Sequence, residues 1–246
     1  MKNILLLAAW LGVGLCAESQ MKSLKELTDT SDTGWGVVRE LLPKATNKVQ
    51  LLPVDSARAS EAVYRSQLAV QTTLGAVEYM TGGIMIDDGW IRIIGSGSPR
   101  LPRSLPEWNK GKSVTGYGHD AGFYLVADDV LGGFFALNWG GLGSKDMGKV
   151  FYLAPDDLRW ESTGNSYAEF LQFCFSGDLK TFYKGLRWKS WHQTVDTLRG
   201  DRAFHIMPPL WSKEGKDINK DERYAVPVEE IYSYTLALQQ QILKQK

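Results

Sequence analysis

The sequence is poor in cysteine and histidine, and it has no excess of either charge. Only 2 of its 246 residues are cysteine and 3 are histidine, while 28 Lys and Arg balance 28 Asp and Glu. The neutral balance argues against a nucleic-acid-binding protein, which normally carries a basic excess. No His or Cys residues stand at the spacing of a zinc site, so we expect no metal and no cofactor. What is abundant is apolar: 43% hydrophobic and 11% aromatic residues can fill a sizeable core.

The N-terminal segment is typical of a signal peptide. An uncharged apolar stretch runs from Ile4 to Leu15, and it is shorter than the roughly 20 residues that a transmembrane helix needs. We expect residues 1–17 to be a signal peptide that is cleaved after Ala17. The mature protein is then periplasmic or secreted and not transmembrane. Two alternatives stay open, a lipoprotein signal at Cys16 and a cytoplasmic protein whose translation starts at Met21.

Removal of this segment leaves Cys174 as the only cysteine, so no intrachain disulfide can form. Cys174 lies among Phe170, Phe173 and Phe175. An apolar setting raises the pKa of a thiol and suppresses the thiolate. We therefore interpret Cys174 as a buried structural residue.

The order of sequence patterns predicts an α+β fold. Residues 23–79 are mostly helical, and the last third returns to helix, with a capping box at Ser166–Glu169 and a long amphipathic helix over 228–244. Between them lie apolar strand candidates joined by short turns, at residues 84–86, 90–94, 123–127, 134–137 and 150–153. We expect one domain over residues 21–246, with a central antiparallel sheet of about five to six strands flanked by N-terminal and C-terminal helices.

The stretch around Gly95-Ser-Gly-Ser98 resembles a phosphate-binding loop but lacks its context. Asp88-Gly89 predicts a two-residue hairpin turn, and the glycines follow the second strand of that hairpin. A phosphate cradle needs glycines that lead directly into a helix N-terminus, whereas here prolines follow. We interpret the glycines as a strand end that opens a long basic loop from Pro99 to His119, and loops of this length tend to be functional or mobile.

This loop and its surroundings supply the candidate binding residues. Arginines near the serines favour a small anion, and an aromatic side chain favours a protein partner. The candidates are Arg92, Ser96, Ser98, Arg100, Arg103 and Trp108.

No catalytic motif is present, and we predict no catalytic residue. Three acidic pairs, at 87–88, 128–129 and 156–157, each follow an apolar strand, and aspartate is an ordinary turn residue. We interpret all three pairs as turn residues. The alternative is a hydrolase-type enzyme in which an acidic and histidine cluster converges from the hairpin loops, through Asp87, Asp128, Asp156 and His119.

Tryptophan is unusually frequent, with 9 residues. Trp188 and Trp191 have the i, i+3 spacing of one helix face, and we interpret them as core residues between helix and sheet. A protein-binding patch is the alternative, because aromatic residues dominate interface hot spots.

Several long segments resemble an uncharacterised bacterial family, domain of unknown function 2625. They are QTTLGAVEYMTGGIMIDDGWIRIIGSG (71–97), DVLGGFFALN (129–138), FYLAPDDLRWE (151–161) and YAEFL (167–171). The family has no established activity, so the resemblance implies no catalytic residue. The order of elements is more loosely similar to the SUKH superfamily, which implies an immunity-like role of binding a toxin. Fold alone does not fix function.

Together these observations favour a non-enzymatic, exported binding module that recognises a protein partner or a small anion. The sequence does not identify the partner, and the oligomeric state stays open.

Overall fold

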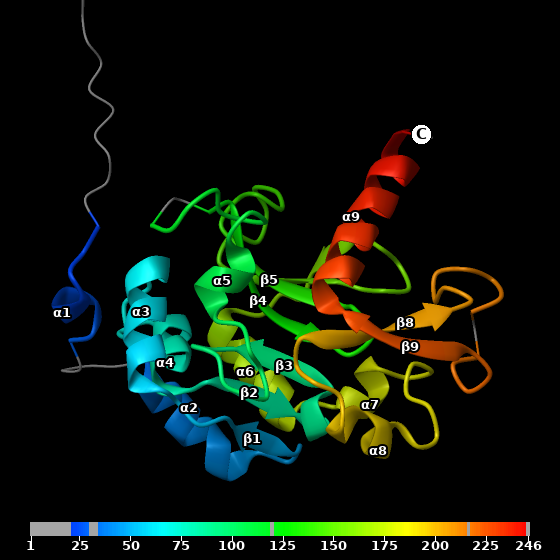
Figure 1. Cartoon of the computed structure of the whole chain (residues 1–246), viewed down its shortest axis with the longest axis horizontal. Coiled ribbons are helices and arrows are strands. Elements are labelled where there is room, and N and C mark those ends of the chain that lie inside the picture. The colour runs from blue at the N-terminus through cyan, green and yellow to red at the C-terminus, as the bar shows by residue number, and fades with distance from the viewer. Residues whose placement is uncertain (1–20, 30–33, 119–120, 216, 245–246) are drawn as a thin grey trace, which may run out of the picture.

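The computed structural model describes residues 21–29, 34–118, 121–215 and 217–244. The segment expected to be a signal peptide, residues 1–17, lies outside these ranges. A twisted sheet forms the centre of the molecule. Helices from the N-terminal third lie at one end, and a hairpin with the C-terminal helix lies at the other (Figure 1). The α+β fold class is confirmed.

The main sheet is a seven-stranded antiparallel meander in which the strands follow one another in chain order. It has more strands than the five to six expected, because three-residue edge strands are too short to show a sequence period. The strands are β1 (Val49–Leu51), β2 (Gly83–Ile86), β3 (Ile91–Ile94), β4 (Phe123–Asp129), β5 (Phe134–Asn138), β6 (Val150–Leu153) and β7 (Trp160–Ser162).

Helices surround this sheet and begin largely where polar caps stand in the sequence. Asp55 caps one helix, and Ser166 with Glu169 forms the expected capping box of another. The helices of the N-terminal part are α1 (Leu24–Leu27), α2 (Trp35–Leu41), α3 (Ser56–Ser66) and α4 (Thr73–Met80), with a 3-10 turn at Leu42–Lys44. Those of the later part are α5 (Leu105–Asn109), α6 (Tyr167–Ser176), α7 (Leu179–Phe182), α8 (Trp191–Asp196) and α9 (Val228–Lys244).

The β2–β3 hairpin forms as expected, but its turn is longer than the two residues predicted. Ile86 pairs with Ile91, so four residues connect the strands, and Asp87–Gly89 form a 3-10 turn. Asp87, Asp88 and Gly89 all have positive φ angles, at 47°, 63° and 98°. Aspartate tolerates this backbone region better than most residues do, which extends the turn beyond the Asp-Gly pair.

The long loop after β3 is more ordered than predicted, because it contains α5. Ser104 caps this helix and Glu107 reaches back to the Ser104 amide. The sequence Ser-Leu-Pro-Glu is a capping box whose proline stands in the first turn, where proline is tolerated. The signal was present in the sequence and was hidden by the prolines around it.

The interpretation of Asp128 as a turn residue is wrong, and Asp129 has a second role beside its turn. Both are fully buried at the end of β4. Asp129 does organise the β4–β5 turn, since its Oδ1 accepts hydrogen bonds from the amides of Leu131 and Gly133, each at 2.9 Å. Its Oδ2 accepts further bonds from Tyr152 (2.6 Å) and from a second tyrosine. Burial nevertheless raises the pKa of Asp129.

The last third contains a β-hairpin that is not among the strands predicted from the sequence. Strands β8 (Arg202–Met207) and β9 (Glu222–Pro227) pair as a separate two-stranded sheet. The amide of Phe204 donates to the carbonyl of Val130, which joins the hairpin to the end of β4 (2.7 Å). The hairpin leads directly into α9, whose bounds agree with the predicted helix.

The tryptophan interpretation is confirmed for the core. Trp188 and Trp191 are buried and pack around Trp90, with ring centroids 5.6 and 5.0 Å away. Only Trp191 belongs to a helix, α8, so the two rings meet through tertiary packing and not through one helix face. Cys174 is fully buried as expected, and burial raises the pKa of its thiol well above the ordinary value.

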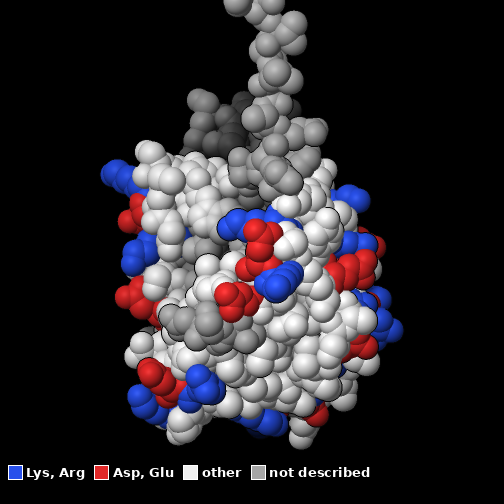
Figure 2. Space-filling view, turned by 90° about the vertical axis from the view of Figure 1, so that its left-hand side faces the viewer, with Lys and Arg blue, Asp and Glu red and all other residues white. Residues whose placement is uncertain are grey.

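The surface carries both charges in close mixture. Figure 2 shows acidic and basic side chains interspersed over the face nearest α1 and α3, in agreement with the neutral balance of the sequence. Within the described ranges, no helix has both the length and the apolar character needed to cross a membrane.

Candidate functional site

Two of the expected binding arginines, Arg92 and Arg103, converge on one buried carboxylate, that of Asp128. Arg92 on β3 lies opposite Asp128 on β4, and its Nε donates to Asp128 Oδ1 at 2.6 Å. Arg92 also donates to the carbonyls of Asp129 and Arg202. Arg103 forms an ion pair with Asp128 Oδ2. The arginine residues therefore act first as internal partners of the sheet.

Arg103 is the least satisfied member of this cluster. Its Nε and Nη1 are buried and have no hydrogen-bond partner among the described residues. Its guanidinium lies over the ring of Trp108 at 4.5 Å, and the ammonium of Lys112 lies 4.3 Å from the same ring. Burial lowers the pKa of Arg103 to about 10, against the raising effect of Asp128. Two guanidinium groups thus share one carboxylate, which leaves the Arg92–Arg103–Asp128 cluster with an excess positive charge.

Ser96, Ser98 and Arg100 each contact a different part of the chain. The Ser96 hydroxyl donates to the Thr81 carbonyl at 2.8 Å, and Ser98 is buried and accepts from the amide of Leu101. Arg100 is partly exposed and pairs with Asp196 at 3.1 Å. Five of the six candidates, all except Arg100, are buried. They do not form one open surface.

Two residues of the hydrolase alternative, Asp87 and Asp128, are paired with different arginines. Asp87 pairs with Arg187 at 2.8 Å, and Asp128 belongs to the arginine cluster. Asp156 is exposed in the turn that follows β6, and His119 lies outside the described residues. Within the part of the chain that the structure describes, no group of three or more His, Cys, Asp or Glu residues is placed to hold a metal ion.

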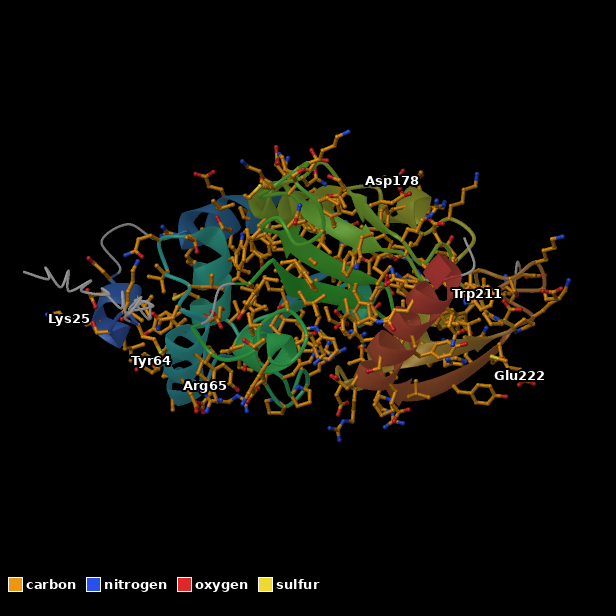
Figure 3. The ribbon with its side chains drawn as sticks, turned by 90° about the horizontal axis from the view of Figure 1, so that it is seen from above. Lys25, Tyr64, Arg65, Asp178, Trp211 and Glu222 are labelled. Carbon is orange, nitrogen blue, oxygen red and sulfur yellow. The ribbon has the colours of Figure 1, made fainter. Side chains whose placement is uncertain are left out.

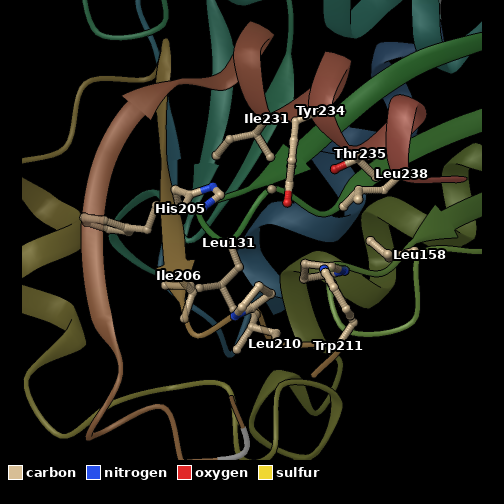
Figure 4. Close-up of a pocket in the computed structure, with 14 residues that line it drawn as sticks. Leu131, Leu158, His205, Ile206, Leu210, Trp211, Ile231, Tyr234, Thr235 and Leu238 are labelled. Atoms are coloured by element: carbon tan, nitrogen blue, oxygen red, sulfur yellow. The ribbon is translucent and has the colours of Figure 1, made fainter. Parts of the chain in front are cut away.

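The structure contains a groove that the sequence reading did not identify. It lies between α9, β8 and the segment that follows β8, and the β4–β5 turn forms its floor (Figure 4). We call it the α9 groove. Its walls are Leu131, Gly132, Pro155, Leu158, Phe204, His205, Ile206, Pro209, Leu210, Trp211, Ile231, Tyr234, Thr235 and Leu238.

Large aromatic side chains stand at the mouth of the α9 groove. Trp211 and Tyr234 are 43% and 45% exposed, and the rings of Tyr234 and His205 lie 5.7 Å apart. Tyr224 lies directly opposite His205 on the neighbouring strand and is 51% exposed. These side chains make the hairpin end of the molecule its most aromatic surface within the described residues.

The apolar stripe of α9 continues past the groove. Val228, Ile231, Thr235, Leu238 and Ile242 follow one another at alternating steps of three and four residues. The first three are buried against the body, whereas Leu238 is half-buried and Ile242 is 43% exposed. This spacing is that of a helix seam that packs against another helix. Leu238 lines the groove together with Leu158, whereas Ile242 is left largely uncovered by the described chain.

The sequence predicts the apolar stripe of α9 but not the residues that surround it. The stripe shows as apolar residues at helical spacing, whereas the polar composition around Trp211 predicts a solvated loop. Because the groove needs the unpredicted β8–β9 hairpin, no pattern within a single segment identifies it.

Comparison with known proteins gives a family without an assigned activity. The family model described as "Protein of unknown function DUF2625" matches residues 24–231. An uncharacterized protein of Haemophilus influenzae is 37% identical over 217 residues, which cover 88% of this chain and 95% of that protein. The uncharacterized protein YbfG of Escherichia coli K12 is 43% identical over 191 residues, which cover 78% of this chain and 86% of that protein.

Proposed function

The chain belongs to the DUF2625 family, whose description assigns no activity, and from its geometry we propose that it is a non-enzymatic binding module for a protein partner. The partner presents an amphipathic helix to the α9 groove and to the exposed half of α9. One observation carries this proposal: the body of the protein covers only the first half of the apolar stripe of α9, and exposed aromatic side chains flank the rest.

The chemistry of the groove favours an apolar partner segment. Trp211 and Tyr234 are anchors of the kind that dominate interface hot spots, because large rigid rings lose little entropy when they are buried. Covering the exposed two fifths of each ring contributes about 2 kcal/mol per residue by area. The half-buried Leu238 and the exposed Ile242 extend the contact along the helix axis, which fits a helix better than an extended strand.

A photo-crosslinking experiment in the native host tests this function. A photoreactive amino acid replaces Tyr234 in one variant and Tyr64 in a control. Both tyrosines are 45% exposed, and Tyr64 lies on α3, at the end of the molecule opposite Trp211 (Figure 3). We expect one discrete crosslinked protein from position 234 and none from position 64.

A second measurement separates the partner from self-association. The crosslinked protein, once identified and purified, binds the wild-type chain in solution, and Trp211→Ala weakens that binding by about tenfold or more. A crosslink to a second copy of this chain, together with a dimer in sedimentation analysis, contradicts the proposal of a different partner. Equal crosslinking from both positions also overturns it.

A small anion is the second candidate, and one observation favours it: the two unpartnered N–H groups of Arg103. Sulfate that binds the folded state raises the unfolding temperature, and the rise grows with the logarithm of the sulfate concentration above its Kd. We expect this rise to exceed that in chloride of equal ionic strength and to vanish in Arg103→Met. Equal curves in sulfate and chloride eliminate the anion candidate.

Export of the chain is part of the proposed function and rests on the apolar stretch of residues 4–15. N-terminal sequencing of the native protein tests it. A mature N-terminus at residue 18 supports export, whereas an N-terminus at Met1 or Met21 contradicts the cleaved signal.

A further inference from the structure

A second hollow lies on the other side of the sheet, away from the α9 groove. It has a volume of about 270 Å³ and is formed where β5, β6 and β7 meet α6 and α7. This volume is slightly below the roughly 300 Å³ at which pockets for drug-sized ligands begin, so it suits a small organic molecule. The lining residues are Phe135, Tyr152, Glu161, Ser162, Thr163, Asn165, Phe170, Phe173 and Phe182.

Aromatic rings form the walls of this hollow. Phe182 lies between Tyr152 and Phe173, with centroid distances of 5.4 and 5.2 Å. Phe135 stacks on Tyr152 at 4.4 Å and closes the inner side. Phe182 itself is 38% exposed, so its ring can be reached from solvent. The rings come from four separate elements, β5, β6, α6 and α7, and line one space.

A single carboxylate stands among these rings, and no cationic side chain lines the hollow. Glu161 pairs with Tyr152 across β6 and β7, so both side chains lie on the same face of the sheet. Glu161 is exposed, and within the described residues its carboxylate makes no hydrogen bond and no salt bridge. The nearby Arg159 pairs with Asp157 at 2.7 Å, and this contact, with a smaller contribution from Glu161, raises the pKa of Arg159. Glu161 therefore has no direct ion-pair partner among the described residues.

We propose that this hollow binds a small organic ammonium cation. The π-faces of Tyr152, Phe173 and Phe182 attract the alkylammonium group, and Glu161 supplies the opposite charge at the mouth. An anion is disfavoured, because two carboxyl groups lie close to the hollow: that of Glu161, which lines it, and that of Asp129, which accepts a hydrogen bond from Tyr152. The site is independent of the α9 groove, since the two share no lining residue.

A pair of probes that differ in charge alone tests the cation. Choline and 3,3-dimethylbutan-1-ol have nearly the same shape, but only choline is charged. Titrations followed by NMR of the aromatic side chains measure both affinities in the purified protein. We expect saturable shifts with choline and an affinity about tenfold weaker for the neutral alcohol.

Variants separate the charge from the apolar surface. Glu161→Gln weakens choline about fivefold and leaves the alcohol unchanged, whereas Glu222→Gln, an exposed strand glutamate at the hairpin end (Figure 3), changes neither. Phe182→Leu keeps an apolar side chain without a π-face, so it weakens choline more than the alcohol. Equal affinities for the two probes, or an absence of saturable shifts with choline, overturn the proposal.

Discussion

Glu78 offers the sharpest test of how this core is built. It lies on α4, is fully buried, and accepts one hydrogen bond at Oε2, from the Ser66 hydroxyl at 2.6 Å. Its Oε1 has no partner among the described residues. Burial raises the pKa of this carboxyl from 4.5 to about 8, although the Ser66 bond opposes the shift. Replacing it in Glu78→Gln removes the titration and keeps the shape.

The expected effect follows from proton linkage. An acid whose pKa is raised on folding destabilises the folded state as the pH rises, because the unfolded chain ionises first. The loss begins near pH 4.5, grows until about pH 8, and is constant above that value. At pH 7 the cost is about 3 kcal/mol, and between pH 5 and pH 8 it grows by about 3 to 4 kcal/mol.

Urea unfolding at several pH values between 5 and 8 measures this difference. We expect the free energy of unfolding of Glu78→Gln, relative to wild type, to increase by about 3 to 4 kcal/mol over that range. The new amide can also shift the stability of the variant by an amount that is the same at every pH, and such a shift does not alter the difference between pH 5 and pH 8. Parallel pH curves for the two proteins would falsify the reasoning. The matched control is Glu40→Gln, an exposed glutamate on α2, whose curve we expect to follow that of wild type.

The Ser66 hydroxyl provides an independent check of the cause. Its hydrogen bond lowers the pKa of Glu78, so Ser66→Ala raises that pKa further. The stability loss then extends to higher pH than in wild type. A loss that ends at lower pH in Ser66→Ala contradicts the assigned role of the hydroxyl.

Three further expectations concern buried groups. Asp128→Ala leaves two buried arginines without their carboxylate, and we expect it to lower the free energy of unfolding by about 3 to 5 kcal/mol. Urea unfolding measures this loss, and a loss below about 1 kcal/mol argues against the cluster. Ser104→Ala removes the cap of α5 and costs about 1 kcal/mol, whereas an unchanged stability means the cap is dispensable. Cys174 resists alkylation until the chain unfolds, and rapid labelling of the native protein contradicts its burial.

Much of the fold was predictable because its signals are local. The α9 helix follows from its helical spacing after Pro227, the β6 strand follows from a short apolar run, and the capping box at Ser166 marks the start of α6. Local signals failed where the segment was short or mixed in composition. The β8–β9 hairpin mixes charged and apolar residues without a regular alternation. Its pairing is stabilised by contacts with α9 and with the end of β4, which no single segment reveals.

The acidic pairs show the same limit for the candidate site. Asp87-Asp88 and Asp128-Asp129 look alike in sequence, yet the first pair forms a turn and the second is buried. The difference arises because Arg92 and Arg103 reach Asp128 from distant parts of the chain. A buried carboxylate requires such partners, and their approach is a property of the tertiary fold.

The two hollows differ in what a ligand would have to supply. The α9 groove is bordered by exposed aromatic rings and an unfinished helix seam, so complementarity requires an apolar partner of considerable length. The hollow between the sheet and α6–α7 is small and has the Glu161 carboxylate at its mouth, so a complementary ligand is a compact molecule with one positive charge. Because they share no lining residue, variants at Tyr234 and at Glu161 are expected to act independently. A ligand that altered the partner's affinity would instead reveal coupling through β4–β6, the strands that join the floors of the two sites.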